Sequence, residues 1–180
     1  IVQRLGLPLI VKPNDAGSSV GISMVKHIEE LKPAVEEAFR FCDSVLLEEY
    51  IEGRELTVSI LDGKALPVVE IRPHDGWYDY HNKYTKGKTD YLAPAPIDEA
   101  VSELCQLYAE RAFFALSCSV YGRVDFRLRD NTPYFLEVNT LPGMTSLSLV
   151  PMAAKAAGIS FEELLQTIIK LSTNTKVEES

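Results

Sequence analysis

The chain has 180 residues, a mass of 20.1 kDa, 46% hydrophobic residues and a formal net charge of −8 at pH 7. A chain of this length buries roughly 70% of the surface of its unfolded state, so its core can form without a disulfide or a structural metal. The acidic balance argues against a nucleic-acid-binding protein, whose footprint is a basic face. No apolar run reaches the roughly 18 residues of a membrane span. We therefore expect neither a nucleic acid nor a membrane as partner.

The cysteines and the first residue support two further expectations. Cys42, Cys105 and Cys118 cannot all pair, and each lies inside an apolar helical pattern. This pattern predicts buried thiols in a reducing compartment. The chain begins with Ile1 in a segment that reads as the end of a helix, so we expect it to be a piece of a longer protein.

Glycine and proline divide the first half of the chain into short elements. Gly6 closes a helical turn, and Pro13 ends a strand. Asp62-Gly63 is a strong signal for a tight hairpin between two strands. Pro33 is expected to restart the helix that contains it. The expected elements are a helical turn at 2–6, strands at 8–13 and 22–25, a helix at 28–42, and strands at 45–50, 55–61 and 65–72.

The second half of the chain contains longer elements. Residues 74–97 are polar and aromatic without a clear period, and a loop of this length in a compact domain is functional or disordered. Asp98 begins a helix whose expected apolar stripe consists of Val101, Leu104, Cys105, Tyr108, Ala112 and Leu116. Strands at 120–129 and 133–139 flank a loop at 130–132, and helices follow from Leu149 and from the capping box at 160–163. The order of elements predicts an α+β fold rich in antiparallel strands.

The last predicted hairpin gathers oxygen-bearing side chains. With a three-residue loop at 130–132, Asp125 lies opposite Glu137, and Arg123 lies opposite Asn139. The other face of the second strand is expected to carry Tyr134, Leu136 and Val138. Facing carboxylates repel each other, so a divalent cation explains the pattern, and all-oxygen ligands favour Mg²⁺ or Mn²⁺ over zinc. The alternative is a solvated strand face with surface ion pairs.

A small, polar loop offers a second candidate site. Gly17 to Gly21 contains two glycines and two serines, whose backbone N–H groups and hydroxyls suit a lid over phosphates. The loop matches neither common glycine-rich nucleotide motif, and it can equally be an ordinary mobile hairpin. Lys12, just before it, can reach an oxyanion or simply extend into solvent.

Two other segments are less informative. The acidic run from Glu48 to Glu55 is typical of an ordinary surface. The long loop contains aromatic and cationic side chains, which fit a substrate lid or a partner surface. These side chains are Trp77, Tyr78, Tyr80, Lys83 and Tyr84. The three histidines show no ligand spacing, and we expect no catalytic role for them.

Five segments, taken together and in this order, resemble one protein family. They are IVKPNDAGSSVGIS, LLEEYIEGRELTVSIL, WYDYHNKY, YGRVDFRL and FLEVNTLPGMTSLSLVPMAAKAAG. They resemble the carboxyl-terminal half of the D-alanine:D-alanine ligases of the ATP-grasp superfamily over about residues 5–172, and the run from Glu137 to Thr145 is highly specific. The resemblance implies an α+β ATP-grasp fold, with antiparallel-rich sheets, packed helices and a nucleotide cleft between two subdomains.

The resemblance also implies how the chain is divided. Residues 1–53 would be the remainder of the central subdomain with its glycine-rich loop, residues 54–173 the carboxyl-terminal subdomain, and residues 174–180 a flexible tail. The amino-terminal domain of the family would be missing, and the full-length protein would be a homodimer in the bacterial cytoplasm. We expect the isolated chain to bind Mg-ATP weakly and to make little or no dipeptide.

The implied reaction is the ATP-dependent ligation of two D-alanines for peptidoglycan synthesis. ATP phosphorylates the carboxylate of the first D-alanine, the amine of the second attacks the acyl phosphate, and phosphate leaves. By resemblance, two Mg²⁺ (or Mn²⁺) ions would bind to Asp125, Glu137 and Asn139. ATP would be held by Lys12, Gly17, Ser18, Ser19, Glu48, Glu49, Ile51, Glu55 and Lys83.

The catalytic roles follow from the same resemblance. Arg123 would stabilise the oxyanion of the tetrahedral intermediate, and Lys83 would touch the transferred phosphoryl group. Ser18 and Tyr84 would join the two loops over the substrate, and the Lys83-Tyr84 pair resembles the dipeptide-forming members, not the ester-forming ones. The second D-alanine would contact Arg123, Gly143, Ser148 and Leu149, at a helix start.

Two positions depart from the family pattern, and two alternatives stay open. Glu49 stands where many members have lysine, and Leu147 replaces a polar or aromatic residue. The first alternative is another ATP-grasp carboxylate-amine ligase that uses a different amino acid. The second is an ATP-binding module without catalysis, which has no need for Arg123.

Overall fold

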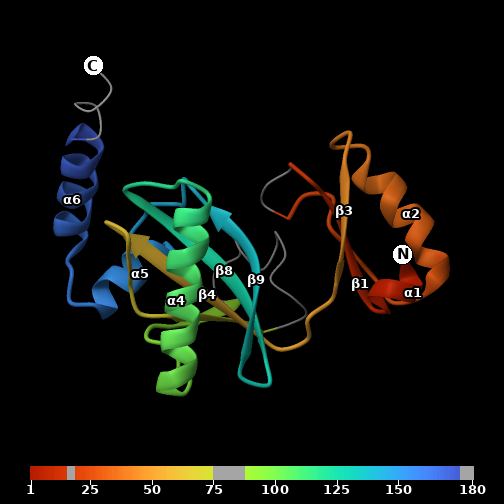
Figure 1. The fold of residues 1–180 in the computed structure, drawn as a ribbon, viewed down its shortest axis with the longest axis horizontal. Coiled ribbons are helices and arrows are strands. Elements are labelled where there is room, and N and C mark those ends of the chain that lie inside the picture. The colour runs from red at the N-terminus through yellow and green to blue at the C-terminus, as the bar shows by residue number, and fades with distance from the viewer. Residues whose placement is uncertain (16–18, 75–87, 175–180) are drawn as a thin grey trace. The chain divides into compact units, whose positions relative to one another are not determined.

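The computed structural model describes residues 1–15, 19–74 and 88–174. The chain divides into two compact units, Ile1–Ile51 with Pro73–Thr89 and Glu52–Arg72 with Asp90–Ser180. Each unit contains an antiparallel sheet (Figure 1). None of the described helices is long and apolar enough to span a membrane. The subdomain boundary expected after residue 53 stays a prediction.

In its described residues the first unit is a small sheet, and the longer of the two described helices packs against it. Its strands lie in the order β2 (Ser23–Val25), β1 (Leu9–Pro13) and β3 (Val45–Glu49). The helix α1 (Val2–Leu5) precedes them and ends at Gly6, as predicted, and α2 (Ile28–Ala38) packs on β1 and β2. The buried core consists of Leu9, Val11, Val25, Ala34 and Ala38. Alternation along β1 turns Lys12 to the face opposite this core.

The helix α2 is shorter than predicted. It begins at Ile28 and continues through Pro33 to Ala38, so Pro33 does not restart it. Cys42 lies beyond the helix, and its Sγ donates to the carbonyl oxygen of Ser44 at 2.7 Å. The apolar spacing continued past the helix because Phe39 and Cys42 belong to the connection that leads to β3.

The second unit contains a six-stranded antiparallel sheet. The order is β7 (Thr89–Leu92), β6 (Val69–Pro73), β4 (Arg54–Leu61), β8 (Tyr121–Arg129) and β9 (Thr132–Asn139), and β5 (Lys64–Ala65) pairs with β4. The predicted strand 65–72 is therefore two strands. Pro67 has no backbone N–H, and the neighbouring Val68 carbonyl accepts from Ala95, so the chain leaves β4 between β5 and β6.

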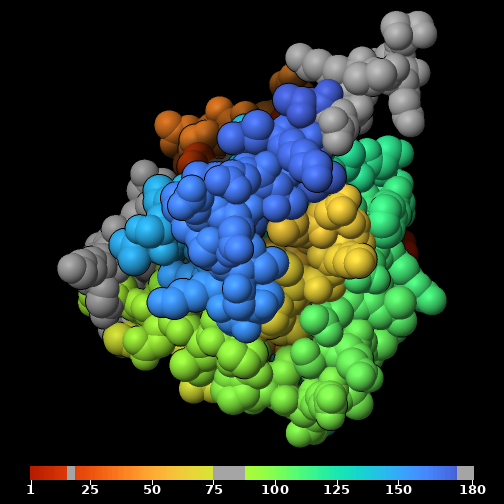
Figure 2. All heavy atoms as spheres, turned by 90° about the vertical axis from the view of Figure 1, so that its left-hand side faces the viewer, coloured from red at the N-terminus to blue at the C-terminus, as the bar shows by residue number. Residues whose placement is uncertain are grey.

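Three helices accompany this sheet. α4 (Glu99–Ala115) lies across one face of it, and α5 (Leu149–Ala156) packs against β4 (Figure 1). α6 (Phe161–Asn174) follows α5, and Figure 2 shows both blue helices beside the yellow part of the chain near the end of β4. The predicted capping box holds, since Ser160 and Glu163 exchange hydrogen bonds at the start of α6. Asn174, assigned to the tail by the sequence, is the last residue of α6.

The main core lies between α4 and one face of β4 and β8. The sheet contributes alternate residues such as Val58 and Val124. The buried stripe of α4 consists of Val101, Cys105, Ala109 and Phe113. The predicted stripe is wrong at Tyr108 and Leu116, which are 39% and 60% exposed, because only every fourth residue faces the sheet. Burial raises the pKa of the Cys105 thiol to about 11, so this thiol is inert at neutral pH.

Candidate active site

The candidate site lies on the hairpin of β8 and β9 in the second unit. Asp130 and Asn131 form a two-residue turn with φ of 50° and 62°. Aspartate and asparagine adopt this left-handed conformation more readily than other side-chain-bearing residues, which suits them to a tight hairpin. Arg129 consequently pairs with Thr132, and the predicted three-residue loop is wrong.

A β-bulge at Leu136 restores the predicted pairing further along the hairpin. With this one extra residue in β9, Asp125 lies opposite Glu137, as the sequence predicts. Tyr134 precedes the bulge and pairs with Arg127. Because the bulge interrupts the alternation of side chains, Tyr134 lies on the same face as Glu137, and the expectation that it faces away is wrong.

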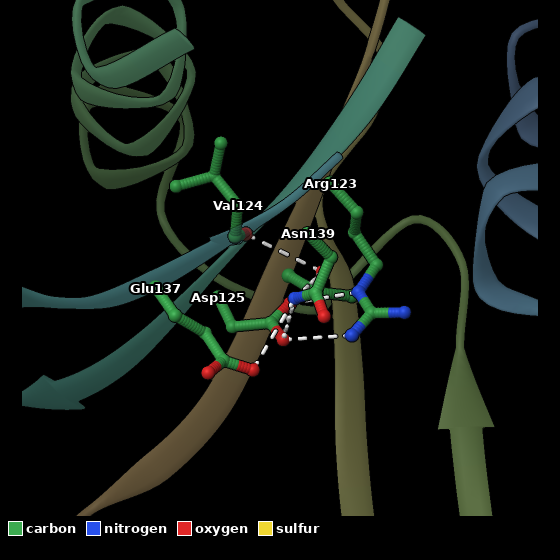
Figure 3. Close-up of polar contacts among 6 residues, drawn as sticks. Arg123, Val124, Asp125, Glu137 and Asn139 are labelled. Atoms are coloured by element: carbon green, nitrogen blue, oxygen red, sulfur yellow. Dashed lines mark hydrogen bonds and ion pairs between the residues drawn. The ribbon is translucent and has the colours of Figure 1, made fainter. Parts of the chain in front are cut away.

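Asp125 is the centre of a hydrogen-bonded cluster (Figure 3). Arg123 donates to both of its carboxylate oxygens, from Nε at 2.9 Å and from Nη2 at 2.8 Å. The Thr57 hydroxyl donates to Oδ1 at 2.6 Å, and the amide nitrogen of Asn139 donates to Oδ2 at 3.0 Å. The same Asn139 nitrogen donates to Oε1 of Glu137 at 3.3 Å. The structure therefore brings together all four residues that the sequence predicts for this hairpin, and adds Thr57.

The donor chemistry of this cluster fits a hard divalent cation. Carboxylate and amide oxygens are the ligands that Mg²⁺ prefers, and Asp125, Glu137 and Asn139 carry them. The amide group of Asn139 lies between the two carboxylates, where its N–H groups partly balance their negative charge. A cation there requires Asn139 to turn its oxygen inward and Arg123 to release part of Asp125. Within the described residues no group of three His, Cys, Asp or Glu is placed to hold a metal, and the metal role of this cluster stays a prediction.

The loop before α5 is organised by one hydroxyl group. Ser148 Oγ accepts a hydrogen bond from the backbone N–H of Thr145 at 3.0 Å and lies 2.9 Å from its Oγ1. A Cβ at Gly143 would lie 3.1 Å from this hydroxyl, so a larger residue would press on it. Leu149 is the buried first residue of α5, whereas Leu147 is 77% exposed. Three of the predicted substrate residues, Gly143, Ser148 and Leu149, thus lie in one short loop and the helix start that follows it, whereas Arg123 lies on β8.

Glu55 lies on β4, directly opposite Arg127 of β8. Arg127 Nη1 is 3.2 Å from Glu55 Oε2, and both side chains are 16% exposed. Thr57, two residues further along β4, pairs with Asp125. The Glu55 carboxylate therefore lies on the same face of the sheet as the Asp125 cluster.

The first unit contains the other predicted ATP contacts. Lys12 Nζ and Glu48 Oε2 form an ion pair at 2.7 Å, between the neighbouring strands β1 and β3. Glu49 ends β3, and Ile51 is buried. Ser19 has a left-handed backbone with φ of 59°. Lys12 and Glu48 thus neutralise each other, and each would have to exchange this partner for a ligand.

Four of the predicted site residues, Gly17, Ser18, Lys83 and Tyr84, lie outside the described residues. The far end of the glycine-rich loop is described, and it supports a packing role for its last glycine. A Cβ at Gly21, where φ is 70°, would lie 2.6 Å from the Phe41 ring. The phosphate role of the loop stays a prediction.

Sequence reasoning did not identify Thr57 and Arg127 as site residues. Both contacts cross from β4 to β8, two strands that lie more than sixty residues apart in the chain. The only sequence signal is that Glu55 and Thr57, two positions apart in a predicted strand, lie on the same face of it. Nothing in the sequence pairs this strand with β8.

Three comparisons with known proteins bear on this site. A family model described as D-ala D-ala ligase C-terminus matches residues 1–170. The chain belongs to this family. It is 52% identical over 166 residues to the D-alanine–D-alanine ligase of Methylacidiphilum infernorum, covering 92% of this chain and 55% of that protein. The chain therefore spans about half the length of the curated relatives it matches.

Solved structures of ligases share the fold of this family member. One is the D-alanine–D-alanine ligase from Bacillus anthracis complexed with ATP, with a TM-score of 0.84, 38% identity, and coverage of 99% of this chain and 57% of that one. Another is the VanG D-Ala:D-Ser ligase from Enterococcus faecalis, with a TM-score of 0.84, 38% identity, and coverage of 94% and 50%. The expected α+β ATP-grasp fold is confirmed.

Proposed function

We propose that this chain is the nucleotide- and metal-binding part of a D-alanine–D-alanine ligase. The observation that carries the proposal is the cluster of Arg123, Asp125, Glu137 and Asn139 in a member of this family. ATP is the proposed phosphoryl donor, because a related ligase was solved with ATP. A purely regulatory ATP-binding module would have no use for an arginine beside the metal ligands.

The proposed reaction forms an amide in two steps. A carboxylate oxygen of the first D-alanine attacks the γ-phosphorus of ATP, the bond to the bridging oxygen breaks, and ADP leaves. The amine of the second D-alanine then attacks the acyl carbon, loses a proton and displaces phosphate. Two Mg²⁺ ions, held by Asp125, Glu137 and Asn139, would balance the negative charge of the phosphates.

Arg123 is the residue that we assign to the oxyanion of the tetrahedral intermediate. Its Nε and Nη2 hold Asp125, while its third nitrogen points away from that carboxylate (Figure 3). A guanidinium group can hold a carboxylate and another anion together, because its N–H donors form a planar fork. This orientation supports a role in which Arg123 keeps Asp125 in place and stabilises the oxyanion.

The remaining roles are proposed for the two units separately. In the first unit, Lys12 would leave Glu48 for the triphosphate, Glu48 and the backbone at Glu49 and Ile51 would hold adenine, and Ser19 would belong to the phosphate loop. In the second unit, Glu55 would bind the ribose hydroxyls. The second D-alanine would contact Arg123, Gly143, Ser148 and Leu149. Gly17, Ser18, Lys83 and Tyr84 keep the phosphate and lid roles that the sequence predicts, and the cytoplasmic location and dimer also stay predictions.

For the second amino acid, the comparisons suggest one specific alternative to D-alanine. VanG, which is similar to this chain, is named a D-Ala:D-Ser ligase, so a D-serine acceptor is the second candidate. The Ser148 loop is the part of the described chain that would distinguish the two amino acids.

ADP release by the protein that carries this chain tests the proposal. D-Alanine alone should stimulate release and give mainly the dipeptide. ADP release that requires D-serine as a second amino acid would favour a D-alanine–D-serine ligase. If D-lactate is added and the product is mainly the ester, the proposal of amide formation is wrong. No stimulation by any amino acid would leave only an ATP-binding module.

A further inference from the structure

Arg127 joins the backbone and the side chain of the segment that contains Glu55. Its Nη1 lies 3.2 Å from Glu55 Oε2, and its Nη2 donates to the carbonyl oxygen of Gly53 at 2.7 Å. One guanidinium group therefore contacts two residues that lie two positions apart. The planar fork of arginine allows these two bonds at once, whereas lysine has a single nitrogen.

The backbone at Gly53 is itself held against the next strand. Its φ is 146°, and a Cβ there would lie 2.0 Å from the carbonyl oxygen of Leu128. Only glycine fits so close to the backbone of β8. The start of β4 is thus fixed by a close backbone approach at Gly53, and the side chain of Glu55 is fixed by Arg127.

Arg129 lies on the same face of β8 but has different partners. Its guanidinium group lies 4.8 Å from the centre of the Tyr134 ring and donates to the Tyr134 hydroxyl at 2.9 Å. Both arginines are partly buried on β8, but β4 begins at Arg54, opposite Leu128, so Arg129 lies beyond the residues of β8 that pair with β4. Arg129 is therefore a natural control for Arg127.

We propose that Arg127 is a positioning residue that holds Glu55 ready for the ribose hydroxyls of the nucleotide. The inference rests on the proposed function, in which Glu55 accepts hydrogen bonds from the ribose. A glutamate side chain rotates freely when exposed, and restricting it before the ligand arrives lowers the entropy lost on binding. A carboxylate has about four acceptor positions, so a bond from Arg127 is compatible with hydrogen bonds from ribose hydroxyls.

The test compares two nucleotides that differ only at the ribose. Isothermal titration calorimetry of the chain would measure the affinities for Mg-ATP and for Mg-2′,3′-dideoxy-ATP. In Arg127→Met the affinity for Mg-ATP should fall by about tenfold, while the affinity for the dideoxy nucleotide should change by less than about twofold. In Arg129→Met both affinities should stay within about twofold of those of the unchanged chain.

A double variant distinguishes positioning from a general loss of structure. In Glu55→Gln the discrimination between the two nucleotides should already be reduced, and adding Arg127→Met should cause little further loss of Mg-ATP affinity. Equal losses for both nucleotides in Arg127→Met, or equal effects of Arg127→Met and Arg129→Met, would overturn the assignment. If the unchanged chain binds neither nucleotide, the proposed function fails and this assignment fails with it. If it binds both equally, only the ribose role of Glu55 and Arg127 is contradicted.

Discussion

At the scale of single residues, Asp125 and Ser59 differ in whether their buried polar atoms have hydrogen-bond partners. Asp125 accepts hydrogen bonds from Arg123, Thr57 and Asn139. Ser59 lies on the same face of β4 and is fully buried, yet its Oγ has no hydrogen-bond partner, the single such side-chain atom found in the described parts of the chain. An unpaired buried hydroxyl disfavours the folded state, whereas a paired one stabilises it.

Two conservative substitutions test this contrast. Thr57→Val removes the hydroxyl that donates to Asp125 and should lower the free energy of unfolding by about 1–2 kcal/mol. Ser59→Ala removes a hydroxyl without a partner and should leave the stability unchanged or raise it. Chemical denaturation would measure both. A loss in Ser59→Ala as large as that in Thr57→Val would mean that Ser59 has a partner, such as a buried water.

Glu70 permits a prediction about pH. This carboxylate is 2% exposed, and each of its oxygens accepts a hydrogen bond from Arg54 at 2.7 Å. It also forms an ion pair with Arg72 at 2.8 Å. Burial alone would raise the pKa of Glu70, but the two arginines outweigh it and lower the pKa below its usual 4.5. Because the folded-state pKa is the lower one, the ionised group stabilises the fold above about pH 4.5, and this contribution is lost as the pH falls further.

Glu70→Gln tests this contribution. The variant should be less stable than the unchanged chain by about 1.5–3 kcal/mol at pH 7, because bonds to a charged group are lost. The difference should shrink as denaturation is repeated at pH values below about 4.5, where the carboxyl group becomes protonated. A difference that stays constant from pH 7 to pH 3 would contradict the role of the charge.

At the scale of elements, the start of β4 depends on a glycine that cannot be replaced. Gly53→Ala would place a methyl group 2.0 Å from the Leu128 carbonyl, at a φ of 146° that is unfavourable for alanine. Gly158 has a φ of 80° but open space around it, so Gly158→Ala controls for backbone strain alone. Thermal unfolding should show a much larger loss for Gly53→Ala than the roughly 1 kcal/mol expected for Gly158→Ala. Similar losses would show that the contact with Leu128 can relax.

The β8–β9 hairpin shows how far its sequence predicts its structure. Alternation and turn residues predict two strands, and the pairing of Asp125 with Glu137 is confirmed. The predicted loop is one residue longer than the observed turn, and the extra residue at the Leu136 bulge compensates for this difference. A bulge depends on packing against other elements, so local residue preferences do not predict it.

At the scale of the whole molecule, the chain contains two units, and each includes residues that the sequence predicts to contact ATP. Within each unit, the structure brings together the residues that the sequence singles out, Lys12 with Glu48 and Arg123 with Asp125. The contacts from β4 to β8, including those of Thr57, could not be predicted because they join distant segments. Sequence patterns report neighbours along a strand, whereas these contacts depend on the order of strands in the sheet.

The proposed function requires the Asp125 cluster to bind the metal ions that accompany ATP. Isothermal titration calorimetry with ATP, with and without Mg²⁺, tests it in the unchanged chain, in Asp125→Asn and in Asp130→Asn. Asp130→Asn makes the same chemical change in the same hairpin, at an exposed turn position that asparagine tolerates. We predict weak binding that depends on Mg²⁺, is lost in Asp125→Asn and persists in Asp130→Asn. Binding that is independent of Mg²⁺, or equal in the two variants, would contradict metal binding by the Asp125 cluster.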